Sequence, residues 1–435
     1  MRIKTCLLSL LLVMLAAGPL MALSFEKERE LSNDYIAELE AAGLVAHEAE
    51  ITWRLQALMD RLAAKIENPL YDFRIDLIRD RSVNAFALPN GRIFINYGTI
   101  LMAEDSDEIS AVLAHEMGHC QLRHVAQRYE DGKRVTAASL AGILAGGLVS
   151  VANPEVGLAL LLSSMGGGQN FTLQFSREYE YQADEFSQNL ITQAGLDNTA
   201  MSRFLVSMRT YSGSNAYPEF FLTHPLGENR IAAIQSNSGK PRPDKSFYEL
   251  KAATIGLMLP TAEVRQRAAL LPEPYGRLAQ GLNLVRTNQA AQALPLLAGL
   301  DLPLARTYSG LALYELGRKA EALPLLEANN RSAETALALA EIYRAQGRKA
   351  EAVSLLRPYG NLNPRAAHAL GELFQEQADE PQSKVYFAYF FYLMRNFRAC
   401  DYQIKEALKQ PDKLDDQTVA ELKQMEKIVK QLVKA

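Results

Sequence analysis

The segment His115-Glu-Met-Gly-His119 has two histidines four positions apart with a glutamate between them. Of all features of the sequence, this spacing most constrains the local structure and the chemistry of the chain. With 6 histidines and 50 acidic residues in the 435-residue chain, about 0.01 such matches are expected by chance. On a helix, residues i and i+4 project from one face, so both imidazoles can bind one metal ion. Glu116 borders that face, within reach of a metal-bound water, and has the position of a general base. The alternative, two histidines on an exposed helix face, leaves Glu116 without a role.

A hydrolytic zinc site needs a third protein ligand if a fourth position is to stay open for water. The extended metzincin pattern does not supply it. Leu122 and Val125 stand where that pattern requires a glycine and a histidine, and His124 falls one place early. The metzincin class is therefore excluded, and the third ligand must come from elsewhere in the chain.

We expect this ligand in the segment 176–184, whose pattern predicts a second helix. Glu178 and Glu180 are both candidates. Glu180 and Asp184 stand four apart on one face, which favours Glu180. One of this pair would bind the metal ion while the other accepts a hydrogen bond from a ligand imidazole.

The N-terminus has the pattern of a processing signal. Arg2 and Lys4 precede an almost wholly apolar run of 11 residues, 7–17, and Ala22 is a small residue at a plausible cleavage site. This order predicts a secretory signal peptide over residues 1–22. The run is shorter than the roughly 20 residues that a bilayer of about 30 Å requires. A retained N-terminal anchor is the alternative.

Between the predicted signal peptide and the histidine pair, the sequence predicts a helix followed by a small sheet. An amphipathic helix is expected over about 31–66. Alternating or short apolar runs predict three strands, 71–77, 84–88 and 92–97. The last could form an edge strand that an extended substrate joins, although an ordinary edge strand explains the pattern nearly as well.

The helix that carries the two histidines has a clear start. Asp105 is followed three residues later by Glu108, the spacing of a capping box. We expect the helix to run to about Glu130. Beyond it, residues 135–168 are strongly apolar and predict a helical hairpin. This hairpin either packs on the protein's own core or forms a flap over the cleft, with peripheral membrane contact through 135–165.

The C-terminal part repeats itself. Residues 317–322 recur as 347–352, a period of 30, and 288–297 is a looser copy spaced by 29. Paired helices at this period resemble tetratricopeptide repeats. They predict an all-α solenoid over residues 274–435 with a C-terminal capping helix, after a linker over 246–273. Its groove is the natural place for a protein partner. A generic helical bundle is the alternative.

Three motifs carry a resemblance to a known family. His115-Glu116-x-x-His119, Glu180-x-x-x-Asp184 and His224-Pro225 with Arg230 resemble the CAAX-prenyl-endopeptidase-like zinc metallopeptidases, as does the strand Asn84-Ala-Phe-Ala. The resemblance implies an α+β zincin-like metallopeptidase domain, a small sheet plus active-site helices, over residues 23–245. It also implies one Zn²⁺ per chain, bound by His115, His119 and Glu180.

The same resemblance implies roles for the remaining site residues. Glu116 would be the general base. Asp184 would be the outer carboxylate that orients a ligand, or a proton donor. His224 would lie over the metal ion, either occupying its fourth position at rest or polarising the developing oxyanion. Arg230 would hold that region or stabilise charge.

A signal peptide ahead of such a domain and repeats behind it are similar to the arrangement in periplasmic members of that family. This implies a periplasmic endopeptidase, with its signal peptide cleaved, that acts on misfolded, stalled or misassembled exported proteins, chiefly of the outer membrane. The repeats would recruit a protein partner, such as the outer-membrane assembly machinery. In the alternative, a chaperone or adaptor-like assembly factor, the repeats dominate and proteolysis is secondary.

Composition excludes other classes of function. The net charge of −4 and the lack of a long basic run argue against nucleic acid as a partner. A membrane-embedded protease is disfavoured, since the chain has no long apolar span. Cleavage of the signal would remove Cys6 and leave Cys120 and Cys400, which we expect to be ordinary buried cysteines.

Overall fold

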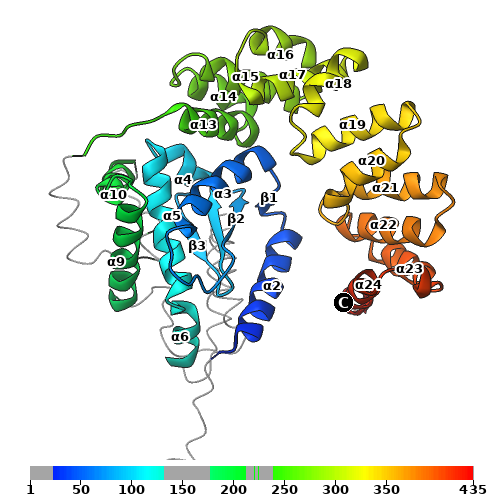
Figure 1. Ribbon diagram of the computed structural model, residues 1–435, viewed down its shortest axis with the longest axis horizontal. Coiled ribbons are helices and arrows are strands. Elements are labelled where there is room, and N and C mark those ends of the chain that lie inside the picture. Colours follow the sequence, from blue (N-terminus) through cyan, green and yellow to red (C-terminus); the bar gives the residue numbers. More distant parts are fainter. Residues whose placement is uncertain (1–22, 132–176, 212–219, 221–223, 225–238, 435) are drawn as a thin grey trace, which may run out of the picture. The chain divides into compact units, whose positions relative to one another are not determined.

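Figure 1 shows the computed structural model, which describes residues 23–131, 177–211, 220, 224 and 239–434. The predicted signal peptide, the apolar segment 135–168 and Arg230 lie outside the described residues. The chain divides after Met258 into two compact units. In the part of the chain that the structure describes, we find no helix with the length and apolar character to cross a bilayer.

The first unit combines a four-stranded sheet with helices. Its strands are β1 (Val45–Ala46), β2 (Arg74–Ile78), β3 (Ala85–Ala87) and β4 (Arg92–Asn96). Its described helices are α2 (Phe25–Ala41), α3 (Ala49–Ala63), α4 (Tyr97–Met102), α5 (Ser106–Gln121), α6 (His124–Asp131), α9 (Arg177–Gln193), α10 (Ala200–Tyr211) and α13 (Lys245–Met258). The expected small sheet plus helices is confirmed.

The strand order is β1-β2-β4-β3, with β2 and β4 parallel and the other pairs antiparallel. In β4, Ile93, Phe94 and Ile95 are all fully buried. Successive side chains of a strand alternate between its faces. Phe94 packs in one cluster with Tyr35 of α2, so Ile93 and Ile95 face the opposite side, where α3 and α5 contact the sheet. Helices therefore cover both faces.

The expectation that residues 92–97 form an edge strand is wrong, because β4 lies between β2 and β3. Three consecutive buried apolar residues are typical of an inner strand. Among the described residues, the edges of the sheet are β1 and β3, and β3 lies against α5.

The single helix expected over 31–66 is also wrong, because the chain forms two helices there. Helix α2 ends at Ala41, and Gly43 takes a φ of +71°, a conformation that glycine adopts without strain. The next residues form β1, which pairs with β2 through Val45 and Ala46. The turn thus converts a continuous amphipathic pattern into two helices joined by a strand.

The helix expected over 105–130 begins as predicted but ends early. The side chain of Asp105 accepts a hydrogen bond from the backbone N–H of Glu108 at 2.9 Å. At the other end, α5 stops at Gln121, and Arg123 has a φ of +55°. A non-glycine residue in this left-handed region interrupts a helix. A second helix, α6, then begins at His124.

The second unit is all-α. Its helices are α14 (Thr261–Ala268), α15 (Tyr275–Arg286), α16 (Ala290–Leu297), α17 (Pro303–Glu315), α18 (Lys319–Glu327), α19 (Ala333–Ala345), α20 (Lys349–Leu356), α21 (Pro364–Glu376), α22 (Glu380–Leu393), α23 (Phe397–Ala407) and α24 (Asp416–Lys434). Consecutive helices pack against each other, and α15, α17, α19 and α21 also contact the next of their set. Successive helix pairs therefore stack.

The sequence repeat corresponds to a repeated turn. Gly317 and Gly347 follow α17 and α19 with φ of +76° and +78°. In both turns, the amide of the following arginine bonds to a carbonyl five residues upstream, at 2.9 and 2.8 Å. A positive φ favours glycine, which explains why the two copies share it.

Most of the range 246–273, which the sequence predicts as a linker, is helical. Helix α13 packs on α3 and α4 within the first unit, where Arg54 donates to Glu249 at 2.9 Å. Helix α14 packs on α15 within the second unit. The division between the units falls between these two helices.

Candidate metal centre

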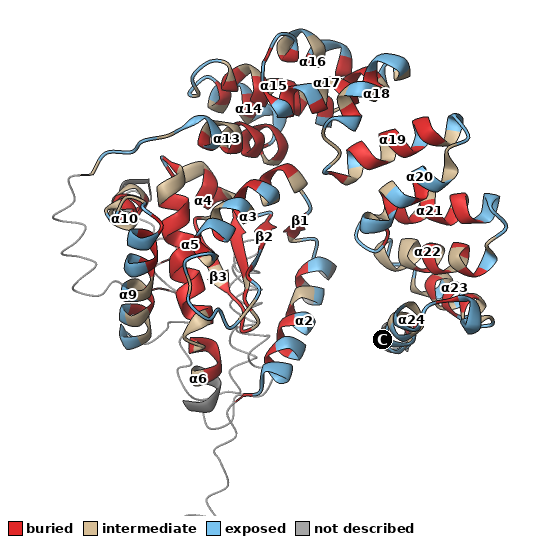
Figure 2. Ribbon diagram, viewed as in Figure 1, coloured by how far each residue is buried: buried red, intermediate tan, exposed pale blue. Residues whose placement is uncertain are grey.

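Helix α5 is buried along most of its length, as Figure 2 shows. Ion pairs with an arginine of α10 hold the N-terminus of α5 in place. Arg203 of α10 donates to Asp105 at 2.6 Å and to Glu108 at 3.3 Å, and all three side chains are buried. Burial raises the pKa of the Glu108 carboxyl to about 7. Charge-assisted hydrogen bonds of this kind are strong inside a protein, so the helix that carries the histidine pair is fixed at its N-terminus.

Gly118, between the two histidines, lets α9 approach α5 closely. A Cβ atom built at this position would lie 3.2 Å from the Cα and the carbonyl oxygen of Ala183. Such a contact is tighter than packed side chains normally allow. The glycine therefore brings the α9 backbone close enough for Glu180, three residues before Ala183, to reach the histidine pair.

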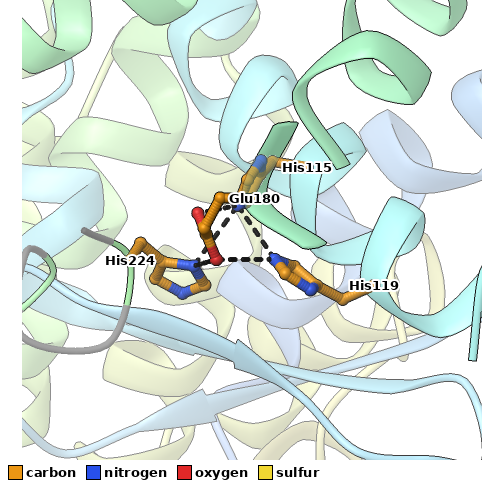
Figure 3. Close-up of side chains that lie close together, drawn as sticks. All are labelled: His115, His119, Glu180 and His224. Atoms are coloured by element: carbon orange, nitrogen blue, oxygen red, sulfur yellow. Dashed lines mark hydrogen bonds and ion pairs between the residues drawn. The ribbon is translucent and has the colours of Figure 1, made fainter. Parts of the chain in front are cut away.

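Four side chains converge at the contact between these helices (Figure 3). His115 and His119 come from α5, Glu180 comes from α9, and His224 lies beyond them in the chain. One ligand atom of each lies within 4.8 Å of the others, and all four residues are buried. The structure thus brings together the three ligands that the sequence analysis expects, with His224 beside them.

The nitrogen and oxygen atoms of the cluster point at one another. The Nε2 atoms of His115 and His119 are 3.1 Å apart. Glu180 Oε1 lies 3.3 Å from His119 Nε2 and 3.0 Å from His224 Nδ1, and its Oε2 lies 3.4 Å from His115 Nε2. The carboxylate therefore faces three imidazoles at once.

The structure distinguishes the two glutamates that the sequence left open. Glu180 is buried in the cluster, whereas Glu178 is exposed and accepts a hydrogen bond from Gln182 at 2.9 Å. Asp184, one helical turn beyond Glu180, lies behind His115: its Oδ1 is 3.0 Å from His115 Nδ1. A carboxylate at that ring nitrogen holds the imidazole with its Nε2 toward the cluster.

Glu116 is fully buried beside the cluster. Its Oε1 lies 3.4 Å from Nε2 of His224. His224 therefore has Glu180 at one ring nitrogen and Glu116 at the other. The ring of Phe220, tilted by 30° and centred 4.6 Å away, packs against it.

Burial and neighbouring charges set the protonation of the cluster. Burial lowers the pKa of His119 well below its usual value. Burial works to raise the pKa of the Glu180 carboxyl, but the surrounding imidazoles, His224 first, hold it well below its ordinary range. A neutral imidazole and an ionised carboxylate are the forms that bind a cation.

This donor set fits a metal ion. Two or three imidazole nitrogens and one carboxylate are the ligand types of zinc sites. They converge from separate helices in a buried place, where histidines and an acidic group with no cation would be costly. The cluster could therefore hold one metal ion.

Sequence reasoning missed one residue of this region, His124. It is fully buried, and its Nδ1 lies 3.0 Å from Nδ1 of His119. In the sequence, His124 corresponds only to a metzincin ligand that falls one place too early. On a continuous helix it would point away from His119, and the break at Arg123 that brings the two together has no glycine to signal it.

A cavity of about 130 Å³ lies on the outer side of Asp184, between α5, α9 and α10. Its lining is mixed, with Ser187 and Gln188 of α9 opposite Met201 and Leu205 of α10. Asp184, whose side chain is 30% exposed, thus separates the buried cluster from an open space.

Residues 49–238, which contain the cluster, match the model of peptidase family M48. The chain is 27% identical over 297 residues to the β-barrel assembly-enhancing protease of Escherichia coli (strain K12), and the match covers 63% of this chain and 60% of that protein. The chain thus spans less than two thirds of that relative.

Two further relatives carry other names. Metalloprotease LoiP of Escherichia coli (strain K12) is 29% identical over 217 residues, which cover 49% of this chain and 81% of LoiP. The mitochondrial metalloendopeptidase OMA1 of Schizosaccharomyces pombe is 30% identical over 164 residues, covering 38% and 46%. All three matches are with proteins named as proteases.

Proposed function

We propose that the chain is a zinc-dependent metalloendopeptidase that hydrolyses misfolded or stalled exported proteins in the periplasm. In support, its residues 49–238 match the model of peptidase family M48, and its relatives are named as proteases. The observation that carries the proposal is the buried convergence of His115, His119 and Glu180. These three side chains would hold one zinc ion per chain.

The residues around this set would perform the reaction. A zinc ion held there would polarise the scissile carbonyl and lower the pKa of an attacking water. Glu116, buried next to the histidine pair, takes the proton of the water and returns it to the leaving amine. Asp184 holds the ring of His115 in place through Nδ1.

His224 has a resting role in this proposal. Its Nδ1 lies among the ligand atoms, 3.3 Å from His115 Nε2 and 3.0 Å from Glu180 Oε1. This position supports His224 as the ligand that would occupy the fourth position of a bound zinc ion at rest, and it would then have to leave that position before substrate is cleaved. Polarisation of the oxyanion, the other role considered for it, would then follow that movement. Arg230 would hold this region or stabilise charge.

The name of the Escherichia coli relative says that it enhances β-barrel assembly. By homology, we propose that this chain acts in the quality control of outer-membrane proteins, with its signal peptide removed on export. The stacked helix pairs of the second unit would recruit protein partners, including the outer-membrane assembly machinery, in the manner of tetratricopeptide repeats.

The test is metal-dependent proteolysis by the purified mature chain. We expect about one zinc ion per chain by elemental analysis and cleavage of an unfolded protein such as reduced casein. Chelation should abolish the cleavage, and stoichiometric zinc should restore it. Cleavage that persists after complete metal removal would contradict the proposal.

A second candidate function, an adaptor or chaperone-like assembly factor, has support from the second unit. Leu316, Leu362, Met394 and Tyr402 are large apolar side chains exposed there. A pull-down from periplasmic extract with Glu116→Gln, with and without residues 259–435, separates the two functions. Partners that require residues 259–435 belong to the second unit, while those that remain belong to the catalytic cleft.

A further inference from the structure

The second zinc-binding histidine, His119, has a neighbour behind it that is an imidazole rather than a carboxylate. His124 is fully buried at the start of α6, and its Nδ1 lies 3.0 Å from Nδ1 of His119. The opposite nitrogen of His119, Nε2, faces Glu180 at 3.3 Å. His124 thus has the place behind His119 that Asp184 has behind His115.

The contacts assign a proton to each ring. A metal-binding Nε2 of His119 must offer its lone pair, so the neutral ring carries its proton on Nδ1 and donates it to Nδ1 of His124. His124 then carries its own proton on Nε2, which donates to the side-chain oxygen of Gln182 at 3.1 Å. The amide nitrogen of Gln182 donates in turn to Glu178 at 2.9 Å.

Every donor in this chain of hydrogen bonds meets an acceptor, and the chain ends on a carboxylate. Four groups take part: His119, His124, Gln182 and Glu178. Each hydrogen bond is donated in the same direction, from the buried cluster toward the exposed Glu178. Neither imidazole ring has to donate from both of its nitrogens. This order also gives a place to Glu178, the glutamate that the cluster does not use.

The fold holds His124 in this position from two sides. Five residues apart on one continuous helix, two side chains point about 140° away from each other. Arg123, with its φ of +55°, breaks the helix and turns His124 back toward His119. Arg123 is itself held by the buried Glu28 of α2 at 2.8 Å. On the other side, the ring of Tyr179 stacks on His124 at 4.7 Å and 16°.

We propose that His124 is a positioning residue that holds His119 as the Nδ1-protonated tautomer, with its Nε2 toward the metal ion. The inference rests on the proposed function, because it needs the cluster to bind zinc. It assigns to Gln182 and Glu178 the task of fixing the tautomer of His124. His124 itself touches neither the metal ion nor the substrate.

The test is a matched pair of variants, His124→Asn and His124→Leu, in the full chain. The two side chains have nearly the same shape and both remove the stack on Tyr179, but only asparagine keeps an acceptor for His119. Zinc affinity is measured by competition with a chromophoric chelator, and the visible absorption of Co²⁺ in the site reports ligand geometry. We expect His124→Leu to bind zinc about 10–100-fold more weakly, with an altered Co²⁺ spectrum, and His124→Asn to retain most of the parental affinity.

Equal zinc affinities and equal Co²⁺ spectra for the two variants would overturn the inference, since a packing role alone affects both alike. If either variant fails to fold, Gln182→Met in the parental background tests the same chain of bonds. It should weaken zinc binding less than the loss of His124, and unchanged affinity and spectrum would count against the inference. A parental chain that binds no zinc would instead refute the proposed function.

Discussion

The two units differ in what they bury. Among the described residues, every buried carboxylate, guanidinium and imidazole lies in the first unit. The buried polar side chains of the second unit are all neutral: Asn283, Thr307, Ser332, Thr335 and Ser383. Its charged groups form ion pairs at the surface, such as Arg318 with Glu321 and Arg348 with Glu351.

This difference indicates that the first unit carries the reactive groups and that the second unit is a packed helical framework. A buried charge destabilises a fold unless it is paired or binds a metal ion, so a unit that keeps many of them keeps them for a purpose. The second unit stacks helix pairs through alanine, leucine and aromatic side chains, and among its described residues no carboxylate, guanidinium or imidazole is buried. We therefore expect substitutions in the two units to have different kinds of effect.

The largest expected effect tests whether the buried charges serve catalysis. Glu116→Gln keeps the shape of the side chain but removes the base, and should lower proteolysis by roughly 10²–10⁴-fold or more. Zinc content and the unfolding transition should stay as in the parental chain. Glu185→Gln, at an exposed position of α9, is the control. An unfolded substrate cleaved by Glu116→Gln at the parental rate would refute the assignment of the base.

The next effect tests which of the two glutamates of α9, Glu180 or Glu178, binds the metal ion. Glu180→Gln should weaken zinc binding by more than the roughly 10–100-fold that loss of an outer hydrogen-bond partner costs. Glu178→Gln, two positions away on the exposed face of α9, should change it much less. Both variants are measured by chelator competition. The reverse order of the two affinities would mean that the wrong glutamate has been assigned.

The stability of the two units should depend differently on pH. The pKa of His119 is lowered by burial, so the metal-free folded chain keeps this ring neutral while the unfolded chain takes up a proton below about pH 6.5. Stability is therefore complete above that pH and falls as the pH drops, by up to about 1.4 kcal/mol per pH unit for one such group. Zinc should be released as the pH falls further, because its ligands must be deprotonated and burial keeps the His119 ring of the folded chain neutral to a lower pH.

Hydrogen exchange of the full chain at pH 7 and pH 5, followed by peptide, measures this effect unit by unit. Protection should fall in α5 and α9 of the metal-free chain and change less in the second unit. Equal loss of protection in both units would contradict the comparison, as would full zinc occupancy well below the histidine range.

The smallest effects come from two glycines. Gly118→Ala pushes a Cβ to 3.2 Å from Ala183, so it should separate α5 from α9 and weaken both zinc binding and stability. Gly347→Ala meets no atom within 4 Å but has a φ of +78°, so it should cost about 1 kcal/mol of stability. Zinc affinity and thermal unfolding of both variants test this, and weaker zinc binding in Gly347→Ala would argue against independent units.

Sequence patterns predicted the elements better than their connections. The start of α5 at Asp105 follows from a local capping contact, which any chain with that spacing can make. The split of 31–66 at Gly43 and the break at Arg123 were missed, since an amphipathic period continues across both. The place of β4 inside the sheet depends on which strand pairs with it, and no local pattern contains that pairing.

The sequence by itself determined the histidine pair, the flanking glutamate and the helix that presents them, because four-residue spacing on a helix is a local property. It also determined the repeated turns at Gly317 and Gly347, since a positive φ calls for glycine. Only the tertiary structure decided that Glu180 rather than Glu178 faces the pair, and that His124 lies behind His119. Both depend on the distance between α5, α9 and the turn at Arg123, and packing between distant segments sets that distance.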